Sequence, residues 1–278
     1  MAGSRQSAEL LGFGGSARQE RRRRRLFAGK HPDDYAGLAA AVAALGLRPR
    51  GGFRPAPGEG VPDEAGAPAA TLVLIGALGE SHWPAFSRSP ERRDGRPDPL
   101  DRWSRRLIEG LASEWRARAL FPFDGPPPWP FQRWAARAEP LHASPLGLLI
   151  HPHYGLWHSY RGALAFGRSL QGLPVREALP SPCAACEERP CLSACPAGAF
   201  AANQPPVRTA RFDAGAPVGY DTGRCAAHLD GPGARACLAA ACLARAACPV
   251  GAAHRYGPAA ARFHLGAFKA SLDGSRRA

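Results

Sequence analysis

Eight cysteines, all between residues 183 and 248 of a 278-residue chain, constrain the fold more than any other feature. They form two runs, Cys183-x2-Cys186-x4-Cys191-x3-Cys195-Pro196 and Cys225-x11-Cys237-x4-Cys242-x5-Cys248-Pro249. Each run has four thiols and ends in Cys-Pro, and a proline at that position keeps a helix from extending through the last cysteine. The pattern predicts two sites of four thiolates each.

An even number of cysteines also suits a disulfide framework in a secreted protein. The segment Arg24–Phe27 resembles part of a twin-arginine export signal, but the charged sequence His31–Asp34 follows where an apolar stretch is required. We therefore expect a cytoplasmic protein with metal-bound thiolates. No run of about 18 apolar residues occurs, so we expect no membrane span.

The formal net charge of +13 is unevenly distributed along the chain. Residues 1–30 hold eight basic and two acidic side chains, which include the block Arg21–Arg25, and we interpret this segment as a flexible basic arm. The remaining charge is spread over the chain without a periodic basic stripe. We therefore do not expect nucleic acid as a partner.

Iron and zinc are the two metals that suit these thiolates. The two runs are similar to those of bacterial ferredoxins, where the fourth cysteine of one run binds the other cluster. The spacing departs from that pattern, because the first run has x4 in its middle and the second is stretched throughout. Four-cysteine zinc sites favour two Cys-x2-Cys knuckles, and this chain has one, formed by Cys183 and Cys186. The pattern favours two [4Fe-4S] clusters, with zinc as the alternative.

The segment Asp221–Cys225, followed by a late group that ends in Cys-Pro, resembles the iron-sulfur module of epoxyqueuosine reductases and reductive dehalogenases. The resemblance implies a crossed arrangement of ligands. In that arrangement one cluster is held by Cys183, Cys186, Cys191 and Cys248, and the other by Cys195, Cys225, Cys237 and Cys242.

Secondary structure is predicted most clearly at two places in the first 175 residues. Thr71–Ile75 is a short continuous apolar run, typical of a buried central strand. Asp98 is a candidate cap for a helix with Pro99 at its first position. A buried stripe is predicted on that helix at Leu100, Trp103, Leu107, Leu111 and Trp115. We also expect a helix from Asp33 or Asp34 to about Gly46, and strands at 119–123, 146–150 and 157–166.

The stretch Leu148–Leu164 resembles part of the vertebrate CblC-type cobalamin-processing proteins, from an Ile-His-Pro through Gly, Trp and Arg-Gly to an apolar strand. Asp98–Asp101, which opens a helix, and Thr71–Leu72, which opens a strand, are similar to other segments of that family in the same order. The resemblance implies an α+β fold with a nitroreductase-like corrinoid-binding domain over residues 31–178. A loop-rich, two-cluster ferredoxin-like domain would follow over residues 179–260, with residues 261–278 as a C-terminal tail.

Four residues of this stretch are candidates for the corrinoid pocket: His151, Tyr154, Trp157 and Arg161. Each also has a purely structural interpretation. His151 suits an ordinary turn, Trp157 a core position, and Arg161 a salt bridge to a carboxylate, since a buried guanidinium needs a partner.

Together these features predict an iron-sulfur oxidoreductase. Electrons from a reduced ferredoxin or flavodoxin would pass through two clusters to a bound cobalamin, which would be reduced and lose its upper ligand. The alternative is a ferredoxin-like electron carrier without a corrinoid. An epoxyqueuosine reductase-like enzyme and a zinc-stabilised nucleic-acid-binding protein are further alternatives.

Overall fold

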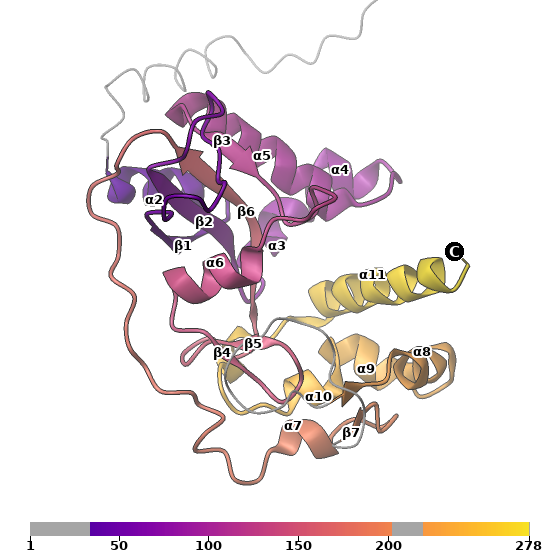
Figure 1. Cartoon of the computed structure of the whole chain (residues 1–278). Helices are drawn as coiled ribbons and strands as arrows, with labels where there is room; N and C mark the ends of the chain where they lie inside the picture. Colours follow the sequence, from indigo (N-terminus) through magenta and orange to yellow (C-terminus); the bar gives the residue numbers. More distant parts are fainter. Residues whose placement is uncertain (1–33, 202–218, 278) are drawn as a thin grey trace, which may run out of the picture. The chain divides into compact units, whose positions relative to one another are not determined.

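A four-stranded antiparallel sheet organises the N-terminal part of the protein (Figure 1). The computed structural model describes residues 34–201 and 219–277, so the basic arm predicted at residues 1–30 lies outside the described residues. The sheet has the order β1-β2-β6-β3, and its strands are β1 (Arg48–Phe53), β2 (Thr71–Leu78), β6 (His158–Phe166) and β3 (Arg118–Leu120). Strand β2 is buried from Thr71 to Ala77, which confirms the central strand predicted from its apolar run.

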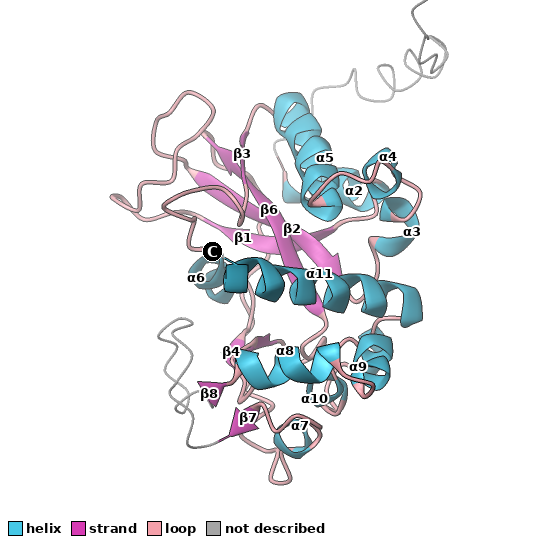
Figure 2. Cartoon of the chain, turned by 90° about the vertical axis from the view of Figure 1, so that its right-hand side faces the viewer, coloured by secondary structure: helices cyan, strands magenta, loops and turns pink. Residues whose placement is uncertain are grey.

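Helices cover both faces of this sheet (Figure 2). Val73 and Ile75 pack in one core with α2 (Tyr35–Ala44) and α5 (Pro99–Trp115). Leu72 and Leu74 pack in a second core with α6 (Phe131–Ala138). Because successive strand residues point to opposite faces, a strand covered on both sides is apolar at every position.

Helix α5 begins at Pro99 as predicted, but its predicted cap is wrong. Asp98 has a left-handed backbone, with φ of 49°, and its side chain makes no capping hydrogen bond. A capping side chain requires an extended backbone at its own residue, so this conformation carries the carboxylate away from the first turn. The predicted stripe is buried at four positions and partly buried at Leu107.

Two of the predicted strands are shorter than the sequence indicates. Strand β3 ends at Leu120, because the Asp124 carboxylate accepts a hydrogen bond from the Phe121 amide and closes a turn. Of residues 146–150, only β5 (Leu149–Ile150) is a strand, and its partner is β4 (His142–Ala143) rather than β6. A tight turn, closed by the Ser144 amide on the Leu148 carbonyl, removes the preceding residues from the strand.

The cysteine region consists of short elements joined by turns. They are α7 (Pro190–Ser193), β7 (Phe200–Ala201), β8 (Gly219–Tyr220), α8 (Thr222–Asp230), α9 (Ala234–Ala240), α10 (Leu243–Ala246) and the 3-10 helix η1 (Ala252–His254). Two further short helices, α3 (Trp83–Phe86) and α4 (Pro90–Arg93), lie before α5.

Residues 261–277, which the sequence sets apart as a tail, belong to helix α11 (Pro258–Arg277). Leu265 and Phe268 of this helix pack with the cysteine region, while Phe263 packs against the core that contains Phe86. Helix α11 therefore packs against both the cysteine region and the core beside the sheet. Among the described helices, none has the length and apolarity needed to cross a bilayer.

Candidate metal centres

The first group of thiols contains Cys183, Cys186, Cys191 and Cys248, none of which forms a disulfide. Burial raises the pKa of Cys183 to about 11, with smaller contributions from Cys248, Cys191 and Cys186. Burial also raises the pKa of Cys191, again with contributions from Cys248 and Cys186. These four side chains therefore lie within electrostatic range of one another, although Cys248 is far from the others in sequence.

The second group contains Cys195, Cys225, Cys237 and Cys242. Burial raises the pKa of Cys237, and Cys195 and Cys225 add to the effect. Burial likewise raises the pKa of Cys242, with contributions from Cys237 and Cys195. All four side chains line one cavity of about 290 Å³. Cys248 thus lies near cysteines of the first run, and Cys195 lies near cysteines of the second.

Backbone amides are directed at several of these sulfur atoms. The Ala199 amide donates to Cys195 Sγ at 3.4 Å. Amides of Ala244 and Arg245 donate to Cys242 and lower its pKa in opposition to burial. Such N–H donors stabilise thiolates, and hydrogen bonds to sulfur are one of the means by which proteins adjust iron-sulfur clusters.

Left-handed backbone makes this arrangement possible at the end of α9. Ala241 and Cys242 have φ values of 52° and 90°, so the chain reverses there and α10 begins directly after the cysteine. A side chain rarely adopts this conformation without a reason. Here the reversal brings Cys242 into the wall of the cavity.

The described residues contain no group of three or more His, Cys, Asp or Glu side chains arranged to hold a metal ion. A structural zinc site brings four thiolates onto one ion, about 2.3 Å from each sulfur. In a cubane cluster each thiolate binds a different iron, so its ligands stand farther apart. Two groups of four thiols, one of them around a shared cavity, fit a cluster better than a single ion.

The predicted pocket residues His151 and Tyr154 lie together in a turn closed by the pairing of His151 with Gly155. Their ring centroids are 4.4 Å apart. His151 is buried, and burial lowers its pKa to about 4. The imidazole is therefore neutral near pH 7, and its Nδ1 accepts a hydrogen bond from the His153 amide.

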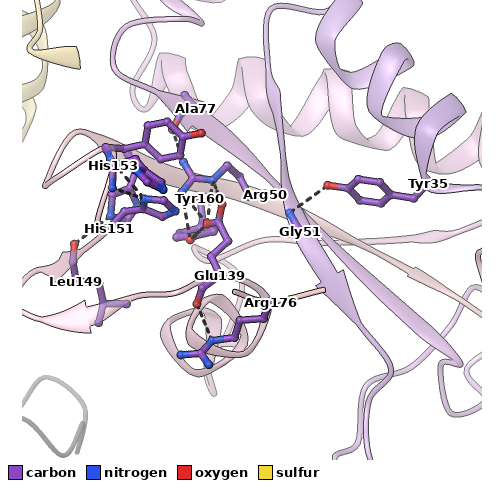
Figure 3. Close-up of polar contacts among 12 residues, drawn as sticks. Tyr35, Arg50, Gly51, Ala77, Glu139, Leu149, His151, His153, Tyr160 and Arg176 are labelled. Atoms are coloured by element: carbon purple, nitrogen blue, oxygen red, sulfur yellow. Dashed lines mark hydrogen bonds and ion pairs between the residues drawn. The ribbon is translucent and has the colours of Figure 1, made fainter. Parts of the chain in front are cut away.

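Beside this turn lies a buried ion pair that the sequence analysis did not identify (Figure 3). The Arg50 side chain is 1% exposed and donates to Glu139 through Nε at 2.9 Å and Nη2 at 2.6 Å. The Tyr160 hydroxyl donates to the same carboxylate, and Arg50 Nη1 donates to the Ala77 carbonyl at 3.1 Å. Every polar end of the network thus has a partner, as buried charge requires.

A β-bulge accounts for the position of Arg50. The register of β1 against β2 shifts between Pro49 and Gly52, and Gly51 within the bulge has φ of 70°. A Cβ on Gly51 would lie 2.8 Å from the Ala138 carbonyl oxygen. Arg-Gly-Gly in a short strand was the available sequence signal, because bulges redirect side chains and favour glycine.

Trp157 and Arg161 lie in two other environments. Trp157 is fully buried against Tyr256, with the Arg245 guanidinium 4.2 Å from its ring centroid. Arg161 pairs with Asp101 of α5, and its Nε donates to a serine hydroxyl at 3.1 Å. Trp157 thus occupies a core position, and Arg161 forms a salt bridge with a carboxylate.

A second bulge separates Arg161 from the residues before it. Ile75 pairs with Gly162 and Gly76 with Tyr160, which leaves Arg161 as the extra residue of β6. The bulge interrupts the regular alternation of the strand and redirects the side chain of Arg161. The structure therefore does not bring the four predicted pocket residues together.

The 151–157 segment is nevertheless attached to the cysteine region. Gly155 and Gly251 face each other with φ of 57° and 71°, and a Cβ on either one would overlap the other segment's backbone. Arg245 of α10 also donates to the Leu156 carbonyl at 2.6 and 3.1 Å. The turn that carries His151 therefore packs directly on the chain that follows Cys248.

A comparison with protein-family models gives no match, and a comparison with curated proteins gives none either.

Proposed function

We propose that the protein is an iron-sulfur oxidoreductase with two [4Fe-4S] clusters. The observation that carries the proposal is the division of eight thiols into two groups of four, the second of which lines a common cavity. Cys183, Cys186, Cys191 and Cys248 would hold one cluster, and Cys195, Cys225, Cys237 and Cys242 the other. Bound clusters of this type supply one-electron transfer at low potential.

The chain's own residues prepare these sites. Burial holds the pKa of Cys183 and Cys237 above the usual value, so both side chains are protonated thiols before they bind metal. Binding requires the thiolate and therefore releases protons. The amides directed at Cys195 and Cys242 stabilise the anionic form and offset part of this cost.

We propose as the electron acceptor a corrinoid bound by the N-terminal part, which would have the nitroreductase-like fold implied by the resemblance. Two observations support an acceptor at this place. The mixed α and β architecture with its small antiparallel sheet is compatible with the α+β class. The turn with His151 and Tyr154 packs on the segment after Cys248, so a molecule bound there would lie close to the first cluster. A reduced ferredoxin or flavodoxin in the cytoplasm would be the electron donor.

Metal analysis of anaerobically reconstituted protein tests the cluster proposal. About eight irons and eight sulfides per chain are expected, with a broad absorption near about 400 nm that bleaches on reduction. Cys183→Ser and Cys195→Ser should each remove one cluster and leave the other. Ser193→Ala is the matched control, because this residue lies between Cys191 and Cys195 in sequence and its hydroxyl donates to the Pro190 carbonyl. A colourless protein that binds zinc under these conditions would overturn the proposal.

A cobalamin titration on the cluster-loaded protein tests the acceptor. Binding with loss of the lower axial base changes the visible spectrum of the corrinoid, and a saturable change of this kind is expected. No change at saturating cobalamin would refute the corrinoid and leave a ferredoxin-like electron carrier.

A further inference from the structure

The cavity of the second cysteine group is lined by a few polar side chains as well as by thiols. Its lining includes the imidazoles of His228 from α8 and His264 from α11, and the phenol of Tyr220 from β8. The Tyr220 hydroxyl donates a hydrogen bond to the Cys225 thiol. Three elements of the C-terminal part thus place hydrogen-bonding groups around one apolar space.

Both imidazoles have a nitrogen without a partner. Nε2 of His228 and Nε2 of His264 are buried and make no hydrogen bond within the described part of the chain. An unsatisfied buried polar group is costly, so native structures rarely contain one without a ligand or a water beside it. Two histidines that line one cavity, each with an unpartnered nitrogen, suit an occupant that accepts hydrogen bonds.

The surrounding residues hold these rings in place. A Cβ on Gly233 would lie 2.7 Å from His228 Cε1, so the absence of a side chain there makes room for the ring. The His264 ring stacks on Tyr256 with centroids 4.7 Å apart, and the Arg245 guanidinium lies 4.9 Å from the Tyr256 centroid. Neither ring can turn far without displacing a packed neighbour.

We propose that His228 and His264 donate hydrogen bonds through Nε2–H to sulfur atoms of the cluster in this cavity, and thereby raise its reduction potential. This inference rests on the proposed function, because it requires a cluster bound by the second cysteine group. Reduction adds negative charge to the cluster, and an N–H directed at sulfur stabilises the reduced state more than the oxidised state. The two residues act as positioned donors, and neither is a metal ligand.

The size of the effect follows from the strength of such bonds. A hydrogen bond to a charged group is stronger than one between neutral groups, and part of its strength differs between the two redox states. We expect removal of each donor to lower the equilibrium constant for reduction about tenfold, which is about 59 mV for a one-electron couple.

An EPR-monitored redox titration of cluster-loaded protein tests the inference. His228→Phe and His264→Phe remove the N–H and keep a planar ring, and each should lower the potential of one cluster while the other stays constant. His228→Gln and His264→Gln retain an N–H donor and should restore most of the shift. His153→Phe, an exposed histidine outside the cavity lining, is the control.

Two outcomes would overturn the inference. Unchanged potentials in the Phe variants, with about eight irons still bound, would show that the imidazoles do not contact a cluster. If the variants fail to bind iron, pulsed EPR of the reduced wild-type protein with 15N-labelled histidine decides, because no nitrogen coupling to either cluster would exclude the hydrogen bonds. A wild-type protein that binds no iron would refute the proposed function itself.

Discussion

The contact between Gly155 and Gly251 provides a sharp test of how the cysteine region is attached to the sheet. In the variant Gly155→Ala, the new Cβ would lie 2.7 Å from the Val250 carbonyl carbon and 3.3 Å from the Gly251 amide nitrogen. Both neighbours are backbone atoms, so neither can move aside as the end of a side chain does. Gly58→Ala is the matched control, because Gly58 has φ of 86° and nothing within 4 Å of a new Cβ.

The expected magnitudes separate conformational strain from the contact. In both variants alanine adopts a left-handed backbone at a cost of roughly 1–2 kcal/mol. Both also gain about 0.4–1 kcal/mol, because alanine restricts the unfolded chain. Gly58→Ala should therefore destabilise by about 1 kcal/mol or less. Gly155→Ala adds overpacking of about 1–3 kcal/mol, which brings its total to about 2–4 kcal/mol.

Apparent melting temperatures of cluster-loaded protein, measured anaerobically at one scan rate by circular dichroism, provide the assay. In a domain of this size 1 kcal/mol corresponds to about 2–4 °C. Gly155→Ala should therefore melt about 4–16 °C below wild type, and Gly58→Ala about 4 °C below it or less. Equal losses in the two variants would refute the reasoning, since strain alone would then account for both.

Three further predictions concern buried charge and histidine. Arg50→Met should destabilise by about 3–5 kcal/mol in urea unfolding, because it leaves the Glu139 carboxylate buried without its partner, and adding Glu139→Leu should recover much of the loss. Arg245→Met should lower the melting temperature by an amount equivalent to about 2–3 kcal/mol, since it removes the hydrogen bonds to a main-chain carbonyl and the contact with Trp157. Burial lowers the pKa of His82 to about 3, so this histidine stabilises the protein above pH 6.5, and the contribution is lost as the pH falls toward about 3. Wild type should lose about 2 kcal/mol through His82 between pH 7 and pH 5, and His82→Phe should abolish that part of the loss in unfolding measurements at the two pH values.

Each of these three predictions would be refuted by a specific outcome. A double variant at Arg50 and Glu139 as unstable as the single one would show that packing, not the unpaired charge, dominates. An Arg245→Met variant that melts with wild type would assign the attachment to the glycine contact alone. An unchanged pH dependence in His82→Phe would show that folding does not lower the pKa of this imidazole.

Local sequence determined the elements whose stabilising contacts are close in the chain. The continuous apolar run of β2 and the spacing of apolar residues along α5 indicate burial directly, because strand and helix periods fix which side chains share a face. The start of α5 at Pro99 was also predictable, because proline suits the first position of a helix. Asp98 failed as a cap because its backbone conformation depends on the preceding loop as well as on its own side chain.

The sequence could predict the candidate site only in part. The eight cysteines were identifiable as two runs of four, but their spacing alone left open which thiols gather. Cys248 lies near the first run and Cys195 near the second, and the left-handed backbone at Ala241 and Cys242 turns the chain before it reaches Cys248. Loop closure over such separations is decided by the packing of the whole region.

Only the tertiary structure decided the surroundings of the predicted pocket residues. Arg50 and Glu139 are 89 positions apart, and a bulge that no local pattern fixes brings them together. A second bulge at Arg161 breaks the alternation of β6 and separates the side chains of this strand. The sequence by itself thus determined which residue types and which buried elements the protein has. Which of these residues meet was decided by bulges, turns and distant packing, because such contacts depend on parts of the chain that no short window contains.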